Sequence, residues 1–509
     1  MYRLPTFLLM ILALSHSPAW ADVRLPAIIG SNMVLQQKTN APIWGWAEPG
    51  EEVKVQGSWQ STATSVQADA QGRWQVRLAT PKSGDTHTIT ITGKNKITLD
   101  NVLAGEVWVG SGQSNMQWAV RNSNDSEREI QAANYPEIRL FYVQRKTADT
   151  PLTDCEGSWQ VCSPATVPDF SAVAYFFARS LHQELGVPLG IINTSWGGTP
   201  AEAWTRRQIL EADEDFRPII DRFEAAQGSY ADAKRKHEAQ LAKWEKSVKE
   251  AKEAGKPTPR RPGFRHLGDP GNPHRPGTLY NAMLAPLIPY RIAGVIWYQG
   301  ESNAGRAYQY RTLFPAMIRN WRADWGQGEF PFYFVQIAPY KGQTPEIRAA
   351  QLIAHRNTAN TGIVVTMDIG NPDNIHPRNK QDVGKRLALW ARSEHYGQED
   401  LVHCGPLYRS FKVEGHRIRI FFDHTGSGLM AKGGALTDFV VAKEGGPFVP
   451  AQARIDGDSI LVWSDQVSRP AEVRYGWENA AQPNLFNREK LPASPFRTDT
   501  RPGTTFGKY

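Results

Sequence analysis

Between residues 104 and 400, short apolar segments alternate with longer segments of helical periodicity, and this alternation limits the fold more than any other feature of the chain. Apolar runs of strand length occur at 107–109, 138–143, 189–193, 294–298, 332–336 and 362–367. Helical periodicity is found at 172–185, 307–325 and 378–396. Apolar strands separated by helices are typical of a parallel sheet that helices cover on both faces. The sequence therefore predicts an α/β core over 104–400.

The regions on either side of this core have the alternating pattern of β-strands. Residues 22–103 contain several such segments with turn residues between them, which predicts a small β-sandwich. Residues 401–509 return to the same pattern and end in a Gly- and Pro-rich stretch that we expect to be irregular. An insertion at about 205–265 is rich in Ala, Lys and Glu, with pairs such as Glu245 and Lys249 at helical spacing. We expect an exposed helical hairpin there.

Residues 1–21 have the pattern of a secretory signal. Arg3 precedes an apolar run at 7–14, and Ala19-Trp20-Ala21 fits the small-x-small cleavage rule. An uncleaved anchor is the alternative, although the apolar run is too short to span a bilayer. We expect a mature chain that begins at Asp22, is exported to the periplasm or beyond, and is not inserted in a membrane.

Charge and cysteine content narrow the expected partners. The net charge is +7, and removal of Arg3 with the signal would leave +6, which is mild for 509 residues. No nucleic-acid motif accompanies it, so we expect no nucleic-acid partner. The three cysteines lack zinc-site spacing. Cys155 and Cys162 flank a short loop and are expected to pair in an oxidising compartment, leaving Cys404 as a lone thiol.

A candidate nucleophile follows the first apolar strand of the core. Residues 110–116 read Gly-Ser-Gly-Gln-Ser-Asn-Met. Glycines allow a sharp turn that presents a hydroxyl to a substrate, which makes Ser114 the candidate. The alternative is that Ser114 only caps the next helix. The stretch differs from the nucleophile elbow of α/β-hydrolases, because Met116 stands where that motif has its second glycine.

A candidate base lies in Asp373-Asn374-Ile375-His376-Pro377. Pro377 suits the first position of a helix, which would place His376 on the loop entering it. Asp373 could turn back to one ring nitrogen and leave the other to accept a proton from a serine. The alternative is an Asp that caps a helix beside a surface His.

Two further strand ends carry small or polar residues. One reads Trp-Tyr-Gln-Gly-Glu-Ser-Asn at 297–303, and the other reads Asn-Thr-Ser-Trp-Gly-Gly-Thr at 193–199. Open α/β sheets bind ligands at the carboxyl ends of their strands. The two glycines of the second segment can expose backbone N–H groups to an oxyanion.

In this order, the four segments resemble those of the sialate O-acetylesterase family of carbohydrate esterases, within the SGNH hydrolase superfamily. The resemblance implies a flavodoxin-like three-layer α/β/α core with flanking β domains. It implies Ser114 as nucleophile, His376 as base and acid, and Asp373 as the carboxylate that orients the ring.

The resemblance also implies an oxyanion hole and substrate contacts. The superfamily's Gly-x-Asn-Asp block reads Gly-Glu-Ser-Asn at 300–303 here, so its asparagine is replaced by Ser302. The expected oxyanion donors are the N–H groups of Ser114 and Gly198 and the side chain of Gln299, with Asn303 as the alternative side chain. The expected substrate-binding residues are Gln113, Asn115, Glu301 and Asn303.

The implied activity is removal of acetyl groups from sugars by a secreted Ser-His-Asp esterase without metal or cofactor. Members of this kind act on acetylated sialic acid, and others act on acetylated xylan or xyloglucan. Arg306 and Arg378 lie near motif loops, where each is either a partner for a sugar carboxylate or structural. The competing interpretations are a glycoside hydrolase that uses Glu301 and Asp373, and a non-catalytic carbohydrate-binding protein.

Overall fold

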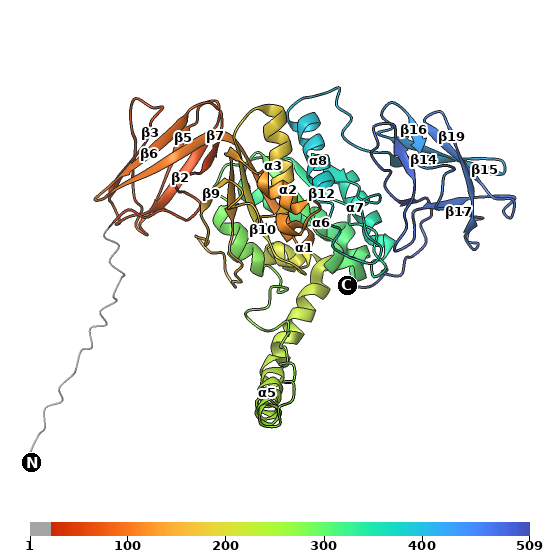
Figure 1. Cartoon of the computed structure of the whole chain (residues 1–509), viewed down its shortest axis with the longest axis horizontal. Helices are drawn as coiled ribbons and strands as arrows, with labels where there is room; N and C mark the ends of the chain where they lie inside the picture. Colours follow the sequence, from red (N-terminus) through yellow and green to blue (C-terminus); the bar gives the residue numbers. More distant parts are fainter. Residues whose placement is uncertain (1–21) are drawn as a thin grey trace, which may run out of the picture.

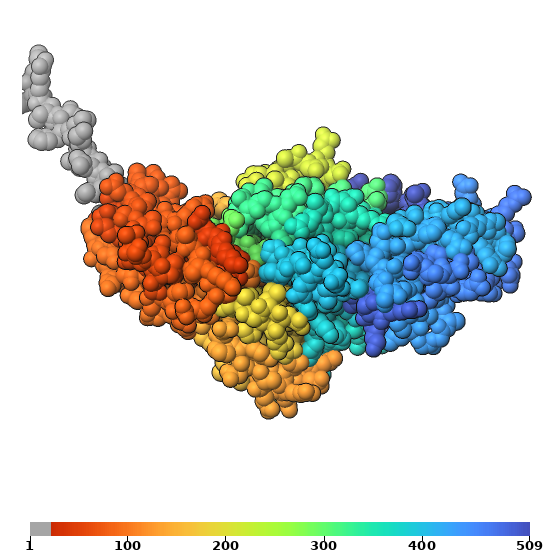
Figure 2. Space-filling view, turned by 90° about the horizontal axis from the view of Figure 1, so that it is seen from above, coloured from red at the N-terminus to blue at the C-terminus, as the bar shows by residue number. Residues whose placement is uncertain are grey.

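The computed structural model describes residues 22–509, which form three regions in a row (Figures 1 and 2). A β region at each end flanks a central α/β region, and one long helix projects from the centre (Figure 1). The expected signal at 1–21 lies outside the described residues. In the described part of the chain, no helix combines the length and apolarity needed to cross a membrane.

The N-terminal region is built from seven strands in two sheets. They are β1 (Val34–Gln36), β2 (Asn40–Trp46), β3 (Glu52–Gly57), β4 (Thr64–Gln67), β5 (Arg73–Ala79), β6 (Thr86–Thr92) and β7 (Lys96–Gly112). β2 pairs with β5, while β3, β4 and β6 lie in the sheet that β7 also joins. β7 pairs with β6 over its first half and with the central sheet from Glu106 onward. The expected boundary at 103/104 therefore falls inside one continuous strand.

The central sheet continues from β7 through six further strands. They are β8 (Tyr135–Tyr142), β9 (Trp159–Cys162), β10 (Leu189–Ser195), β11 (Gly294–Tyr298), β12 (Phe332–Val335) and β13 (Thr361–Val364). Their order is β13-β12-β11-β7-β10-β8-β9, and all neighbours are parallel except β8 and β9. β7 is therefore central, and the carboxyl ends of β10, β7 and β11 lie side by side.

Helices cover both faces of this sheet. The α-helices of the described residues are α1 (Ser114–Gln117), α2 (Ser126–Gln131), α3 (Ala172–Leu185), α4 (Arg207–Glu211), α5 (Arg217–Glu253), α6 (Ala307–Trp325), α7 (Pro345–Arg356) and α8 (Gln381–Trp390), of which α5 projects away from the sheet. Trp108 on β7 packs against Phe177 of α3, whereas Trp297 on β11 packs against Trp321 of α6. All four side chains are buried. The expected three-layer α/β/α core is present.

The helix after His376 begins later than its sequence suggests. The structure begins α8 at Gln381, so Pro377 lies in the preceding loop and not at the first helical position. Asn379 Oδ1 accepts the N–H of Asp382 at 3.1 Å, which satisfies one donor at the start of the helix. By contrast, α3 and α6 have the predicted bounds.

The insertion is one long helix, not a helical hairpin. α5 spans 37 residues, and the chain after it returns alongside without a second helix. The ring of Phe264 stacks on His237, with centroids 4.8 Å apart, and Trp244 Nε1 donates to Pro259 O at 2.8 Å. Prolines within 256–276 remove helical N–H donors, which explains why the returning segment is extended.

The C-terminal region contains small antiparallel sheets docked on the α/β region. Its strands are β14 (Leu407–Glu414), β15 (Arg417–Asp423), β16 (Leu429–Ala431), β17 (Phe439–Ala442), β18 (Val449–Pro450), β19 (Gln452–Asp456), β20 (Ser459–Trp463), β21 (Glu472–Tyr475), β22 (Leu485–Asn487) and β23 (Phe496–Arg497). Arg348 of α7 is fully buried and donates to Glu478 O at 2.6 Å. The chain end then returns to the α/β region (Figure 1).

The three cysteines are free and buried, so the expected Cys155–Cys162 disulfide is wrong. The residues between them include β9, a strand of four residues that ends at Cys162. An extended strand rises about 3.3 Å per residue, which keeps the two ends of this segment apart. Burial raises the pKa of both thiols to about 12.

We expect three reactive thiols per chain when the protein is denatured without reductant. The reason is that neither Cys155 nor Cys162 has a bonded partner in the fold. The measurement is titration with a thiol-specific chromogenic reagent in guanidinium chloride, with a reduced sample as the control. A count of one thiol would contradict the structure.

Candidate active site

Ser114 is the first residue of α1, directly beyond the end of β7. Gly112 has φ 138°, and a Cβ there would lie 2.2 Å from Tyr298 O, so the turn requires glycine. Gln113, not Ser114, occupies the N-cap position of α1. The capping interpretation of Ser114 is therefore wrong, and its hydroxyl is left for another partner.

That partner is His376. The Nε2 atom of His376 lies 2.8 Å from Ser114 Oγ, although the two residues are 262 positions apart. The His376 ring stacks on Trp118, which follows α1, with centroids 5.1 Å apart and planes 18° apart. Burial, and then the positive charge of Lys380, lower the pKa of His376. The neutral ring that can accept a proton is therefore favoured down to a lower pH than usual.

Asp373 does not reach the His376 ring. Its carboxylate pairs with Lys341 Nζ, and its side chain is 74% exposed. Within residues 22–509, no hydrogen bond or ion pair joins Asp373 to His376. The loop folds into local turns instead, because Asn371 Oδ1 accepts the N–H of Asp373 and Asn374 Oδ1 accepts the N–H of His376, both at 2.9 Å. The structure thus unites two members of the expected triad and leaves the third at the surface.

The expected substrate-binding residue Asn115 lies fully buried beneath this pair. Its Nδ2 donates to Glu301 Oε1 at 2.6 Å and to Ile375 O at 3.0 Å. Its Oδ1 accepts from Lys380 Nζ at 2.6 Å. Every one of these bonds is internal, so Asn115 joins the His376 loop to the strand ends and does not contact substrate.

Gln113 and Glu301 are also part of the floor of the site. Gln113 is buried, and its Oε1 accepts the N–H of Ser302 at 3.2 Å. Glu301 is buried against Asn115, and burial raises the pKa of its carboxyl. Both side chains are therefore largely removed from the surface, and their contact with substrate stays a prediction.

Lys380 is a site residue that the sequence reasoning missed. It is fully buried between aromatic rings, with Nζ 5.1 Å from the centroid of Tyr298, and burial lowers its pKa to about 7. Nearby Glu301 opposes this effect by favouring the charged amine. Its place four residues after His376, the candidate base, is the sequence signal that could have revealed Lys380 as a site residue. The expected helix start at Pro377 instead placed it in an ordinary first turn.

The segment after β10 forms another wall of the candidate active site, next to Ser114. Gly197 N donates to Gln117 Oε1 at 2.7 Å, and a Cβ at Gly197 would lie 3.3 Å from Ser114 Cβ. The next residue, Gly198, is exposed with φ 77°, and its N–H has no acceptor within residues 22–509. The structure therefore places Gly197 beside Ser114 and leaves the N–H of Gly198, the next residue, free to act as the predicted oxyanion donor.

Gln299 does not serve as the side-chain oxyanion donor in this arrangement. It is fully buried, its Nε2 donates to Asn303 Oδ1 at 2.7 Å, and its Oε1 accepts from Tyr310 at 2.9 Å. Asn303, the alternative donor and an expected substrate contact, is buried too, and its Nδ2 donates to Glu202 Oε2 at 2.8 Å. In this structure the two amides bond to each other and to the core, so neither is oriented toward an oxyanion or a substrate.

A cavity of about 350 Å³ opens beside Gly198 and Ser302. Its wall includes Arg222 from α5 and Arg306, which ends the 3₁₀ helix η6 (Glu301–Arg306). Arg306 lies 2.5 Å and Arg222 3.8 Å from the buried carboxylate of Glu202. Two guanidinium groups thus share one carboxylate, and the long inserted helix contributes to the wall.

The second arginine of the sequence analysis, Arg378, has a structural role. Its guanidinium donates to the carbonyl oxygens of Asn122 and Ser123 at 3.1 and 3.0 Å. These bonds hold the end of the His376 loop, just before α8, against the segment after α1.

Comparison with known proteins places this site in a family. A sequence model described as "Carbohydrate esterase, sialic acid-specific acetylesterase" matches residues 272–392, which include β11 and His376. The sialate O-acetylesterase of Rattus norvegicus is 32% identical over 454 residues, which cover 80% of each chain. The chain belongs to the sialate O-acetylesterase family. The sialate O-acetylesterase of Homo sapiens is 30% identical over 447 residues, covering 78% of this chain and 77% of the human one.

A solved structure of a similar protein has the same fold as this family member. The crystal structure of a carbohydrate acetylesterase from Xanthomonas citri superimposes with a TM-score of 0.80 at 35% identity. The match covers 94% of this chain and all of the other one, so it includes the flanking β regions. The sialate O-acetylesterase family and this structure together support an esterase that acts on acetylated carbohydrate.

We expect Asp373→Asn to lower kcat on an aryl acetate by less than about 10-fold, because the carboxylate contacts Lys341 and not the His376 ring. An aspartate that orients a catalytic histidine typically contributes about 10⁴-fold. The measurement is steady-state hydrolysis of 4-nitrophenyl acetate, with Ser114→Ala defining complete loss. A loss of about 10⁴-fold in Asp373→Asn would show that this carboxylate turns to the ring during catalysis.

Proposed function

We propose that this protein is an exported carbohydrate O-acetylesterase in which Ser114 is the nucleophile and His376 is the base and acid. The observation that carries the proposal is the 2.8 Å hydrogen bond between Ser114 Oγ and His376 Nε2. A serine bonded to a neutral histidine at a strand end is the arrangement that activates a hydroxyl. The family membership supports acetylated carbohydrate as the substrate class.

The reaction proceeds in two steps. His376 Nε2 accepts the Ser114 proton as Oγ attacks the acetyl carbonyl, and the imidazolium then gives that proton to the departing sugar oxygen. In the second step, His376 deprotonates a water that attacks the acetyl-serine ester, which releases acetate and restores the hydroxyl. The chain's own residues supply every proton transfer.

Backbone donors stabilise the charge that develops on the carbonyl oxygen. As the first residue of α1, Ser114 has an N–H without an intrahelical acceptor, and the Gly198 N–H lacks an acceptor on the opposite wall. One oxyanion donor typically contributes about 10²–10³ in rate. With Gln299 and Asn303 committed to the core, the proposed hole consists of these two N–H groups.

The cavity beside Gly198 favours an acidic sugar as substrate. Arg222 and Arg306 together carry one positive charge more than Glu202 neutralises. Guanidinium groups bind carboxylates by paired hydrogen bonds, as a sialate would require. The second candidate is a neutral acetylated plant polysaccharide such as xylan or xyloglucan. Acetate release from a matched panel of acetylated sialosides, xylans and xyloglucans separates the two.

The proposed site of action is the periplasm or the outside of the cell. The support is the sequence of residues 1–21, with Arg3, an apolar run and Ala19-Trp20-Ala21 in the order of a cleavable signal. The intact mass of the exported protein tests this, since cleavage leaves a chain that begins at Asp22.

We expect Ser114→Ala and His376→Ala each to lower acetate release by about 10⁴-fold or more, because the two side chains act as one unit. Ser302→Ala is the matched control, since its side chain lies on the cavity wall without touching the catalytic pair. The measurements are hydrolysis of 4-nitrophenyl acetate and covalent labelling by a fluorophosphonate. Near-wild-type turnover in Ser114→Ala would refute the proposal.

We expect the pH–rate profile to rise from acid pH through a midpoint below 6.5 and then to level off. The neutral His376 is the active form, and burial with the Lys380 charge lowers the pKa of this ring from the usual 6.5. Lowering the pKa extends activity to more acid pH. The measurement is kcat/KM for an aryl acetate from pH 4 to 9. A midpoint above 7 would indicate a carboxylate at the ring.

A further inference from the structure

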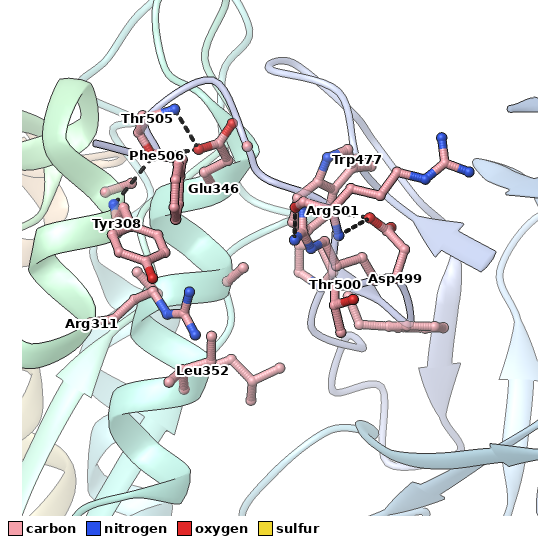
Figure 3. Close-up of a pocket in the computed structure, with 18 of the residues that line it drawn as sticks. Tyr308, Arg311, Glu346, Leu352, Trp477, Asp499, Thr500, Arg501, Thr505 and Phe506 are labelled. Carbon is pink, nitrogen blue, oxygen red and sulfur yellow. Dashed lines mark hydrogen bonds and ion pairs between the residues drawn. The ribbon is translucent and has the colours of Figure 1, made fainter. Parts of the chain in front are cut away.

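A second cavity lies between the α/β region and the C-terminal β region. Its volume is about 430 Å³, within the range of small-molecule sites. Figure 3 shows Tyr308, Arg311 and Phe506 on one side of it and Trp477, Asp499 and Arg501 on the other. Residues from α6, α7, β14 and the chain end line it, whereas Ser114 and His376 do not.

Aromatic rings are unusually accessible in this cavity. Tyr308 is 37% exposed and Phe506 is 53% exposed, and their rings meet edge to face with centroids 4.8 Å apart. Trp477 on the other wall is half-buried. The exposed faces of such rings can make apolar stacking contacts with the C–H face of a sugar, and Tyr and Trp each carry a polar group as well.

The cavity also has positive charge without a matching negative charge. Four arginines and two carboxylates line it, which leaves two formal positive charges. The carboxylate of Asp499 already forms an ion pair with Arg474. The carboxylate of Glu346 accepts hydrogen bonds from the N–H and hydroxyl of Thr504 and from the N–H of Thr505. Neither Arg311 nor Arg356 makes an ion pair with a carboxylate anywhere in residues 22–509.

The positions of these two arginines leave their charges open to a ligand. Arg311 lies over the Tyr308 ring at 4.9 Å and Arg356 over the Tyr408 ring at 5.4 Å, so each stacks on an aromatic wall. A third arginine, Arg501, bonds to Glu472 and leaves a buried Nε atom without a partner. Burial lowers the pKa of Arg497, Asp499 opposes this effect, and the positive charges of Arg474 and Arg311 lower the pKa further. A bound anion would relieve this repulsion.

We propose that this cavity is a second, non-catalytic site that binds a carboxylate-bearing sugar residue, with the carboxylate on Arg311 and the ring against Tyr308. A guanidinium group matches a carboxylate in geometry as well as charge. The site is separate from the catalytic pair and goes beyond the proposed esterase activity. Because its walls come from two regions of the chain, ligand binding also joins the C-terminal β region to the α/β core.

The test is isothermal titration of the full-length protein with methyl glucuronide, methyl glucoside and inorganic phosphate. We expect saturable binding of the glucuronide, with the glucoside at least about 10-fold weaker because it lacks the charge. Arg311→Met should weaken glucuronide binding by about 10-fold or more. Arg319→Met is the matched control, since Arg319 is exposed on the same helix and outside the cavity.

Four results would overturn the proposal. The first is equal binding of glucoside and glucuronide. The second is equal effects of Arg311→Met and Arg319→Met. The third is phosphate binding as tight as that of glucuronide together with no loss in Tyr308→Leu, which would leave an anion site without sugar recognition. The fourth is competitive inhibition of aryl acetate hydrolysis by glucuronide, which would place the ligand at Ser114.

Folding and catalysis are checked separately. If Arg311→Met lowers the melting temperature, Arg356→Met at an exposed position on α7 serves as a second variant. We expect it, too, to weaken glucuronide binding. Hydrolysis of 4-nitrophenyl acetate should stay at the wild-type rate in both variants, since neither arginine touches Ser114 or His376. Failure of sugar binding with intact hydrolysis would overturn this inference alone and leave the esterase proposal standing.

Discussion

The side chain of Asn115 holds the candidate active site together. It binds the backbone of the His376 loop at Ile375, the carboxylate of Glu301 after β11 and the amine of Lys380 before α8. Ser114 is its direct neighbour in sequence, so the same residue that fixes the nucleophile's helix also fixes the base. A buried amide with all its bonds satisfied rigidifies its surroundings, whereas one with a missing partner costs about 1–3 kcal/mol.

Sheet topology brings these side chains to one edge. β7 lies between β10 and β11, and all three strands are parallel, so their carboxyl ends deliver Ser114, Gly198 and Glu301 to the same side of the molecule. β7 is also the strand that begins in the N-terminal sheet. The candidate nucleophile therefore follows the longest strand in residues 22–509, which is anchored in two packed regions and gives the turn at Ser114 little freedom to move.

The sequence predicted the α/β core and the meeting of Ser114 with His376, because strand ends and glycine turns are local patterns with a defined place in a parallel sheet. It did not predict which of the polar side chains at the strand ends turn into the core. Gln299 and Asn303 follow a strand as a ligand-binding residue would, yet the Tyr310 hydroxyl and the Glu202 carboxylate bind their polar atoms in the core. Tyr310 is 11 positions from Gln299 on α6, and Glu202 is 101 positions from Asn303, so the strand-end pattern itself does not specify these pairings. The long inserted helix was recognised, but its extended return was not.

The position of Asp373 shifts the electrostatic demands of the reaction. An aspartate at the ring would raise the basicity of His376 and stabilise the imidazolium, whereas here burial and Lys380 lower its pKa. A less basic histidine is a weaker base but a better acid, which suits proton delivery to a sugar oxygen that leaves as a poor leaving group. In the proposed mechanism, less stabilisation at the imidazolium leaves more of the transition-state stabilisation to the Ser114 and Gly198 N–H groups at the oxyanion. Within the proposed mechanism, Lys380, which donates to Asn115 Oδ1, is the charge that adds to burial in lowering the pKa of His376.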